Sequence, residues 1–191
     1  MGRGHGSGRG TSAKAGGFQG DASMKGYSAG LAKAMTARES EIRNERVENT
    51  SVFDDEGNEL FRAVGTTHDV KIDAKTTPNH IVTHNHPGIA GDSFSQSDIV
   101  NYAFWNAKEI RAVTRNYTYS LKRPEGGWKG GHEKAYKQAK AKVDRADNAY
   151  FKNYKGDMDA ADRRISRTYN HRVNKEFAKI MGYEYTKTRV N

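Results

Sequence analysis

Two histidines on one face of a predicted strand have the clearest capacity for chemistry in this chain. Ile81 and Val82 have the apolar character of a buried strand and lead into a Thr-His-Asn-His-Pro run containing His84 and His86. Residues two apart in a strand point to the same side, so the two Cα atoms lie about 6.6 Å apart. Both imidazoles can then bind one metal ion at roughly 2.0–2.1 Å. Pro87 ends the strand, because proline has no N–H for the ladder.

A carboxylate at the start of the next predicted helix supplies a third ligand. That helix is expected from about Gln96 to Glu109, with Ser95 as the N-cap that accepts from the unpaired N–H groups of the first turn. Asp98 projects from this turn toward the histidines. Two neutral imidazoles and one carboxylate suit zinc and leave a fourth tetrahedral position open, as catalytic zinc sites do. The alternative is that the histidines only end a strand, while Ser95 and Asp98 only cap a helix.

The spacing of these residues resembles a known zinc motif. The His-Asn-His-Pro run, a short glycine loop and the Ser-Gln-Ser-Asp sequence at 95–98 are similar to the motif of JAMM/MPN (JAB-like) metallopeptidases, in particular the RadC-like and phage branches. The similarity spans roughly residues 40–125. Eight residues separate His86 from Ser95, where the family usually has seven, so Ser93 is the alternative to Ser95.

The resemblance also implies a mechanism. The family has a glutamate just ahead of an early strand, and Glu48 stands at that point. Zinc held by His84, His86 and Asp98 would lower the pKa of a water toward about 7. Glu48 would take the proton of that water and pass it to the leaving amine, and Ser95 would hydrogen-bond the oxyanion. The reaction would be hydrolysis of a peptide or isopeptide bond. The alternative for Glu48 is a surface residue in an acidic stretch.

The elements around these residues predict an α+β fold in which helices flank a mixed sheet, the arrangement that the resemblance also implies. A helix is expected within residues 23–46. The Asp-Asp-Glu-Gly-Asn turn at 54–58 joins two short apolar runs and predicts a hairpin. Further strands are expected at 70–73, at 80–84, and at 112–113 and 117–121, the last two being separate or one kinked strand.

Composition divides the chain into three parts. Residues 1–22 are glycine-rich and basic and predict a flexible, disordered tail. Residues 23–130 hold the JAMM-like domain with its N-terminal helix. Residues 131–191 predict a basic helical extension, because apolar residues recur at steps of three and four. They mark one helix up to Tyr154 and a second from Met158 to Ile180, which Gly182 ends.

Charge and composition bound the partners. The 191 residues include 32 lysines and arginines against 23 acidic residues, a net charge of +9. This favours nonspecific contact with nucleic acid through the basic termini, and the alternative is a solvated charged surface. An apolar run of about 18 residues and a secretory signal are both missing, so no membrane partner is expected. The chain has no cysteine, so a disulfide framework is excluded.

The resemblance extends to the JAMM-like domain appended to phage minor head (head-morphogenesis) proteins. It implies a polypeptide substrate, virion or capsid proteins as partners, and a location in the host cytoplasm or the virion. A competing hypothesis is a basic nucleic-acid-binding or virion structural protein that keeps this fold without peptidase activity. A vestigial site would be expected to have lost one of Glu48, His84, His86 and Asp98, and all four are present.

Overall fold

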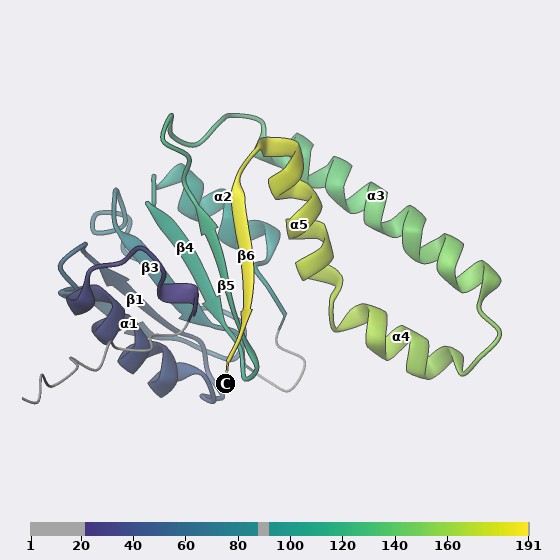
Figure 1. The fold of residues 1–191 in the computed structure, drawn as a ribbon, viewed down its shortest axis with the longest axis horizontal. Helices are drawn as coiled ribbons and strands as arrows, with labels where there is room; N and C mark the ends of the chain where they lie inside the picture. The colour runs from purple at the N-terminus through teal and green to yellow at the C-terminus, as the bar shows by residue number, and fades with distance from the viewer. Residues whose placement is uncertain (1–21, 88–91, 191) are drawn as a thin grey trace, which may run out of the picture.

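The computed structural model describes residues 22–87 and 92–190 and confirms the α+β fold (Figure 1). These residues form one mixed sheet in the order β2-β1-β3-β4-β5-β6, in which β3 and β4 are parallel and all other neighbours antiparallel. The predicted tail at 1–22 lies outside the described residues except for Ala22. The strands are β1 (Asn49–Phe53), β2 (Glu59–Val64), β3 (Ile81–Asn85), β4 (Glu109–Val113), β5 (Tyr117–Lys122) and β6 (Glu184–Arg189).

The predicted hairpin is the β1–β2 pair, and Asp54 organises its turn. One oxygen of the Asp54 carboxylate accepts from the backbone N–H groups of Glu56, Gly57 and Asn58 at 2.8–3.0 Å. Gly57 has a φ of 96°, and a Cβ there would lie 2.8 Å from the backbone of Gly30. Only glycine therefore fits this position, where the turn meets the helix α1 (Ala29–Ile42).

The connection from β3 to β4 passes through α2 (Gln96–Phe104). The prediction that this helix continues to Glu109 was wrong. The chain leaves the helix through Asn106, which has a φ of 56°, and Glu109 begins β4 instead. The prediction of a strand at 70–73 was also wrong, because this segment pairs with none of the strands in the described part of the chain. Val70 and Ile72 instead line a cleft beside α2.

Because side chains alternate along each strand, the sheet has two faces, and different helices cover them. Phe53 and Ile81 pack against α1 and the short helix η1 (Ala22–Met24). Val52, Val82 and Ile110 point to the other face, which α2 and two C-terminal helices cover. His84 follows Val82 by two residues, so it lies on this second face.

A buried ion cluster attaches α1 to the middle of the sheet. Arg111 is fully buried and donates to Glu39 of α1 at 2.6 Å and to its strand neighbour Glu109 at 3.1 Å. The hydroxyl of Thr83 donates to the same Glu39 carboxylate at 3.0 Å. Since a charge this deeply buried is tolerated only when paired, the cluster fixes the back of β3 beside His84.

The C-terminal segment forms α3 (His132–Asn153), α4 (Met158–Ser166), α5 (Tyr169–Met181) and then β6. The first predicted helix is confirmed, whereas the second is divided into α4 and α5 around Thr168. Gly182 ends α5 with a φ of 72°, as predicted. α5 packs against α3, while α4 lies at the far end of the pair (Figure 1). Strand β6 was not predicted, and through it the 131–191 segment supplies the edge strand beside β5.

Candidate metal centre

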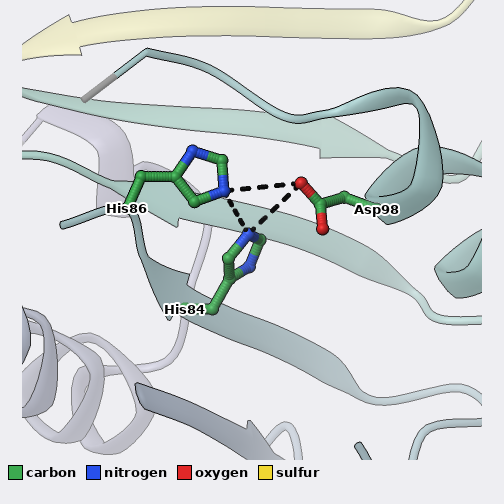
Figure 2. A group of neighbouring side chains, drawn as sticks. All are labelled: His84, His86 and Asp98. Atoms are coloured by element: carbon green, nitrogen blue, oxygen red, sulfur yellow. Dashed lines mark hydrogen bonds and ion pairs between the residues drawn. The ribbon is translucent and has the colours of Figure 1, made fainter. Parts of the chain in front are cut away.

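The structure brings His84, His86 and Asp98 together at the end of β3 (Figure 2). The Nε2 atoms of the two histidines lie 3.0 Å apart. The Oδ2 atom of Asp98 lies 3.7 Å from Nε2 of His84 and 3.4 Å from Nε2 of His86. One nitrogen from each ring and one carboxylate oxygen thus face a common point.

This triangle fits a tetrahedral metal ion. Three ligand atoms at about 2.0–2.1 Å from such an ion lie roughly 3.3 Å from one another, and the three observed distances of 3.0, 3.4 and 3.7 Å scatter around that value. The two Nε2 atoms lie at hydrogen-bond distance, so one neutral ring can donate its Nε2–H to the other. With the hydrogen of each ring on Nδ1, both Nε2 lone pairs would instead face a cation, and two imidazoles with one carboxylate are a donor set that suits zinc.

The two histidines are oriented by different means. The Nδ1 atom of His86 lies 2.8 Å from the backbone oxygen of Asp92. Because a carbonyl can only accept, Nδ1 carries the hydrogen, and Nε2 of the neutral ring is free to bind a metal. His84 is held by ring packing against Tyr102 and Phe94, at centroid distances of 5.7 and 6.3 Å. Its Nδ1 is buried and has no hydrogen-bond partner among the described residues.

Asp98 is held in place by the start of α2. Its carboxylate accepts the backbone N–H of Ser95 at 2.7 Å, and the Ser95 hydroxyl accepts the backbone N–H of Asp98 at 3.1 Å, which is a capping box. Burial alone would raise the pKa of this carboxyl, but His84 and His86 hold that pKa well below its usual range. Asp98 is therefore an anion, which is the state that binds a metal.

Asp98 in turn raises the pKa of His86. Burial lowers the pKa of its imidazole, but the hydrogen bond and charge of Asp98 outweigh burial and raise the pKa above the ordinary 6.5. His86 therefore binds a proton more tightly than a free imidazole does. Metal binding competes with that proton, so zinc affinity is expected to fall in acid.

Glu48 lies beside the three ligands because Asn85 ties its neighbours to β3. The side chain of Asn85 accepts the backbone N–H of Asn49 at 2.7 Å and donates to the backbone oxygen of Val47 at 3.0 Å. In the β1–β3 register Thr50 is paired with His84, and the same register continued by two residues sets Glu48 opposite His86. Asn85 thus helps to place Glu48 on the face of the sheet that carries His84 and His86.

Glu48 has the electrostatics expected of a base. Burial raises the pKa of its carboxyl above the ordinary 4.5, while the nearby His84 and His86 lower it and the charge of Asp98 raises it. The net shift is upward. A half-buried carboxylate with a raised pKa, beside a possible metal site, is suited to take up a proton.

The two serines occupy different environments. Ser95 lines the cleft in front of the histidines, and its hydroxyl contacts that of Ser97 at 2.8 Å while capping α2. Ser93 is buried, and its hydroxyl is engaged by Tyr185 at 2.8 Å and by Asn174 at 3.1 Å. Of the two, only Ser95 faces the space in which a substrate would lie.

The cleft has a volume of about 330 Å³. His68 and Asp69 form part of the rim of the cleft, and both are exposed. They lie in the loop that follows β2, which no sequence motif marks as part of a site. The remaining lining residues are Glu48, Val70, Ile72, His84, His86, Ser95, Ser97, Asp98, Asn101 and Tyr102.

A partly buried histidine on α5 makes stability depend on pH. Nδ1 of His171, on α5, lies 2.8 Å from the Tyr185 hydroxyl, and its backbone N–H donates to Asp92. Burial, together with the positive charges of Lys187, Lys175 and Arg172, lowers the pKa of the imidazole from 6.5 to about 4. The folded protein thus holds His171 neutral where the unfolded chain takes up a proton.

We expect the metal-free protein to lose stability as the pH falls from 6.5 to about 4, and to keep the full contribution above 6.5. The ring is partly exposed, so solvent screening reduces the loss to about 1–2 kcal/mol. Denaturant unfolding at pH 7 and pH 4, in the presence of a chelator, would measure it. His171→Gln should show a smaller difference between the two pH values, and an unchanged difference would contradict the assignment.

Comparison with protein-family models, with curated proteins and with solved structures finds no match to this chain. Within the described ranges 22–87 and 92–190, no helix is both long and apolar enough to cross a membrane. The geometry of the site and the motif in the sequence are therefore the features that indicate a function.

Proposed function

We propose that this chain is a zinc-dependent peptidase or isopeptidase of the JAMM type. The observation that carries the proposal is the triangle of His84 Nε2, His86 Nε2 and Asp98 Oδ2, whose edges match a tetrahedral ion. A carboxylate with a raised pKa stands beside it at Glu48. The mixed sheet between helices agrees with the fold that the motif implies.

The bound metal would supply Lewis-acid activation of a water and of the scissile carbonyl. Glu48 would accept the proton of the attacking water and deliver it to the leaving amine, for which its position beside His86 and its raised pKa both suit it. Asp98 and the histidines would hold the ion and leave room in the cleft for substrate.

The oxyanion would be stabilised from the α2 side of the cleft. Ser95 is the first candidate, because its hydroxyl lies on the cleft and can donate while it accepts the N–H of Asp98. Ser97 and Asn101 line the same wall and are further donors. The buried Ser93 is a weaker candidate, since its hydroxyl is already engaged by Tyr185 and Asn174.

The substrate, the partners and the location remain further proposals. The motif's resemblance to the phage branch supports a virion or capsid polypeptide as substrate or partner, and a place in the host cytoplasm or the virion. Residues 131–191 carry 15 lysines and arginines against eight acidic residues, a net charge of +7. This concentration of charge supports nonspecific contact of the C-terminal segment with nucleic acid.

The proposal predicts about one zinc ion per chain and a hydrolytic activity that depends on it. Elemental analysis of the purified protein gives the zinc content. A mixed peptide and isopeptide library, with cleavage followed by mass spectrometry, gives the activity. Removal of zinc with a chelator should abolish cleavage, and readdition of zinc should restore it. A protein that takes up no zinc at neutral pH would refute the proposal.

A further inference from the structure

Residues 92–94, just ahead of the N-cap of α2, are held by the C-terminal part of the chain. Residues 92–94 lie between His86 and the N-cap of α2, which carries Asp98. Their contacts come from α5 and β6, elements that follow the centre by about 80 residues or more. The 131–191 segment therefore reaches the site through this short stretch.

Asp92 makes two sets of contacts at once. Its backbone oxygen accepts the hydrogen of His86 Nδ1 at 2.8 Å. Its carboxylate accepts the backbone N–H groups of Asn170 at 2.6 Å and His171 at 3.2 Å, in the first turn of α5, and that of Ser93 at 2.7 Å. The anion thus occupies the positive end of α5 and satisfies N–H groups that have no partner inside the helix.

Asn174 and Tyr185 hold the next two residues. The side-chain amide of Asn174, one turn further along α5, donates to the Ser93 hydroxyl at 3.1 Å and to the backbone oxygen of Phe94 at 2.8 Å. The hydroxyl of Tyr185, on β6, contacts the same Ser93 hydroxyl at 2.8 Å. The backbone at 92–94 is therefore fixed at three successive residues.

We propose that Asp92 is a positioning residue for the metal centre: its carboxylate, anchored on the N-terminus of α5, holds the carbonyl that orients His86. This inference rests on the proposed zinc site. The carbonyl alone would be present in any residue at position 92. The carboxylate determines where that carbonyl lies, and through it the tautomer and direction of the His86 ring.

The anchor at Asp92 matters more for His86 than it would for a fully enclosed ring. His84 is 1% exposed and packs against Tyr102 and Phe94, whereas the side chain of His86 is 16% exposed. Without the anchor, the His86 ring would have to be ordered at the moment of metal binding, which costs affinity. Outer hydrogen-bond partners of metal ligands typically contribute roughly 10–100-fold in metal affinity.

The test compares two helix-capping aspartates. Asp92→Ala removes the cap of α5, and Asp157→Ala removes the matching cap of α4, whose carboxylate accepts the N–H of Ala160 at 3.1 Å away from the centre. Zinc affinity is measured by competition with a chromophoric chelator, and the absorption spectrum of the cobalt-substituted protein reports ligand geometry. We expect zinc binding to be roughly 10–100-fold weaker in Asp92→Ala, with an altered cobalt spectrum, and unchanged in Asp157→Ala.

Each possible result supports or overturns either the positioning role of Asp92 or the proposed zinc site. Equal zinc affinity and identical cobalt spectra for wild type and Asp92→Ala would overturn the positioning role while leaving the zinc site intact. An equal loss in both variants would assign the effect to helix capping in general and also overturn it. A wild-type protein without zinc would instead refute the proposed function. If Asp92→Ala does not fold, Asp92→Asn keeps an acceptor oxygen without the charge, and a loss of affinity smaller than 10-fold but measurable is expected; no loss would overturn the role.

Discussion

His84→Ala should remove zinc from the protein. His84 supplies one corner of the three-atom triangle, and its Nε2 lies 3.0 Å from that of His86. The two remaining ligands, His86 and Asp98, cannot hold a tetrahedral ion alone. The affinity should fall by more than the roughly 10–100-fold that loss of an outer partner costs. Elemental analysis after gel filtration should find about one zinc per wild-type chain and almost none in the variant.

The matched control is His80→Ala. His80 immediately precedes β3, and its Nδ1 contacts the backbone oxygen of Thr76 at 2.8 Å, away from the triangle. This variant should keep its zinc. Near-stoichiometric zinc that survives His84→Ala would defeat the assignment of the ligands. Circular dichroism of the metal-free proteins would establish that both variants are folded.

The grouping of the three candidate metal ligands was predictable from the sequence because their geometry is local. The spacing of His84 and His86 follows from the two-residue period of a strand, and the place of Asp98 follows from the first turn of a helix. Each of these rules acts within a few residues. The hairpin β1–β2 was predictable for the same reason, since its turn is closed by Asp54 and its own neighbours.

The features that were not predictable depend on contacts across the chain. Strand β6 has the sequence Glu-Tyr-Thr-Lys-Thr-Arg, which is too polar to indicate a strand, and β5 supplies its pairing. Asp92 looked like an ordinary loop residue, and only the packing of α5 against the sheet brings Asn170 within 2.6 Å of it. The helix that was expected to reach Glu109 ends at Phe104, an aromatic residue that is 83% exposed. The next residue, Trp105, packs against the core instead.

Asn85 has a role that the sequence motif alone does not show. In the sequence it is the residue between two ligands, and its side chain points away from theirs along the strand. In the structure that side chain bridges the backbone on both sides of Glu48, to Val47 and Asn49. The proposed base is therefore attached to the strand that carries the candidate ligands. The amide of Asn85 adds to the β1–β3 pairing in setting their relative position.

Glu48→Gln should abolish hydrolysis and leave zinc in place. Glutamine keeps the size of the side chain but cannot accept the proton of a water, and loss of a general base typically costs roughly 10²–10⁴ in rate. Because burial raises the pKa of Glu48, the fold disfavours its charged form. A neutral glutamine should therefore leave the metal-free protein at least as stable as the wild type at pH 7. Loss of activity in this variant would then not reflect unfolding.

Glu45→Gln is the matched control, since Glu45 is an exposed glutamate three residues earlier in the chain. It should retain full activity against the library peptides that the wild type cleaves, and both variants should bind one zinc. If Glu48→Gln cleaves as fast as wild type, Glu48 is not the base, although the zinc site would stand. If it loses zinc together with activity, the carboxylate contributes to holding the ion, and the proton must be taken by another group on the cleft. The rim residues His68 and Asp69 are then the next to replace.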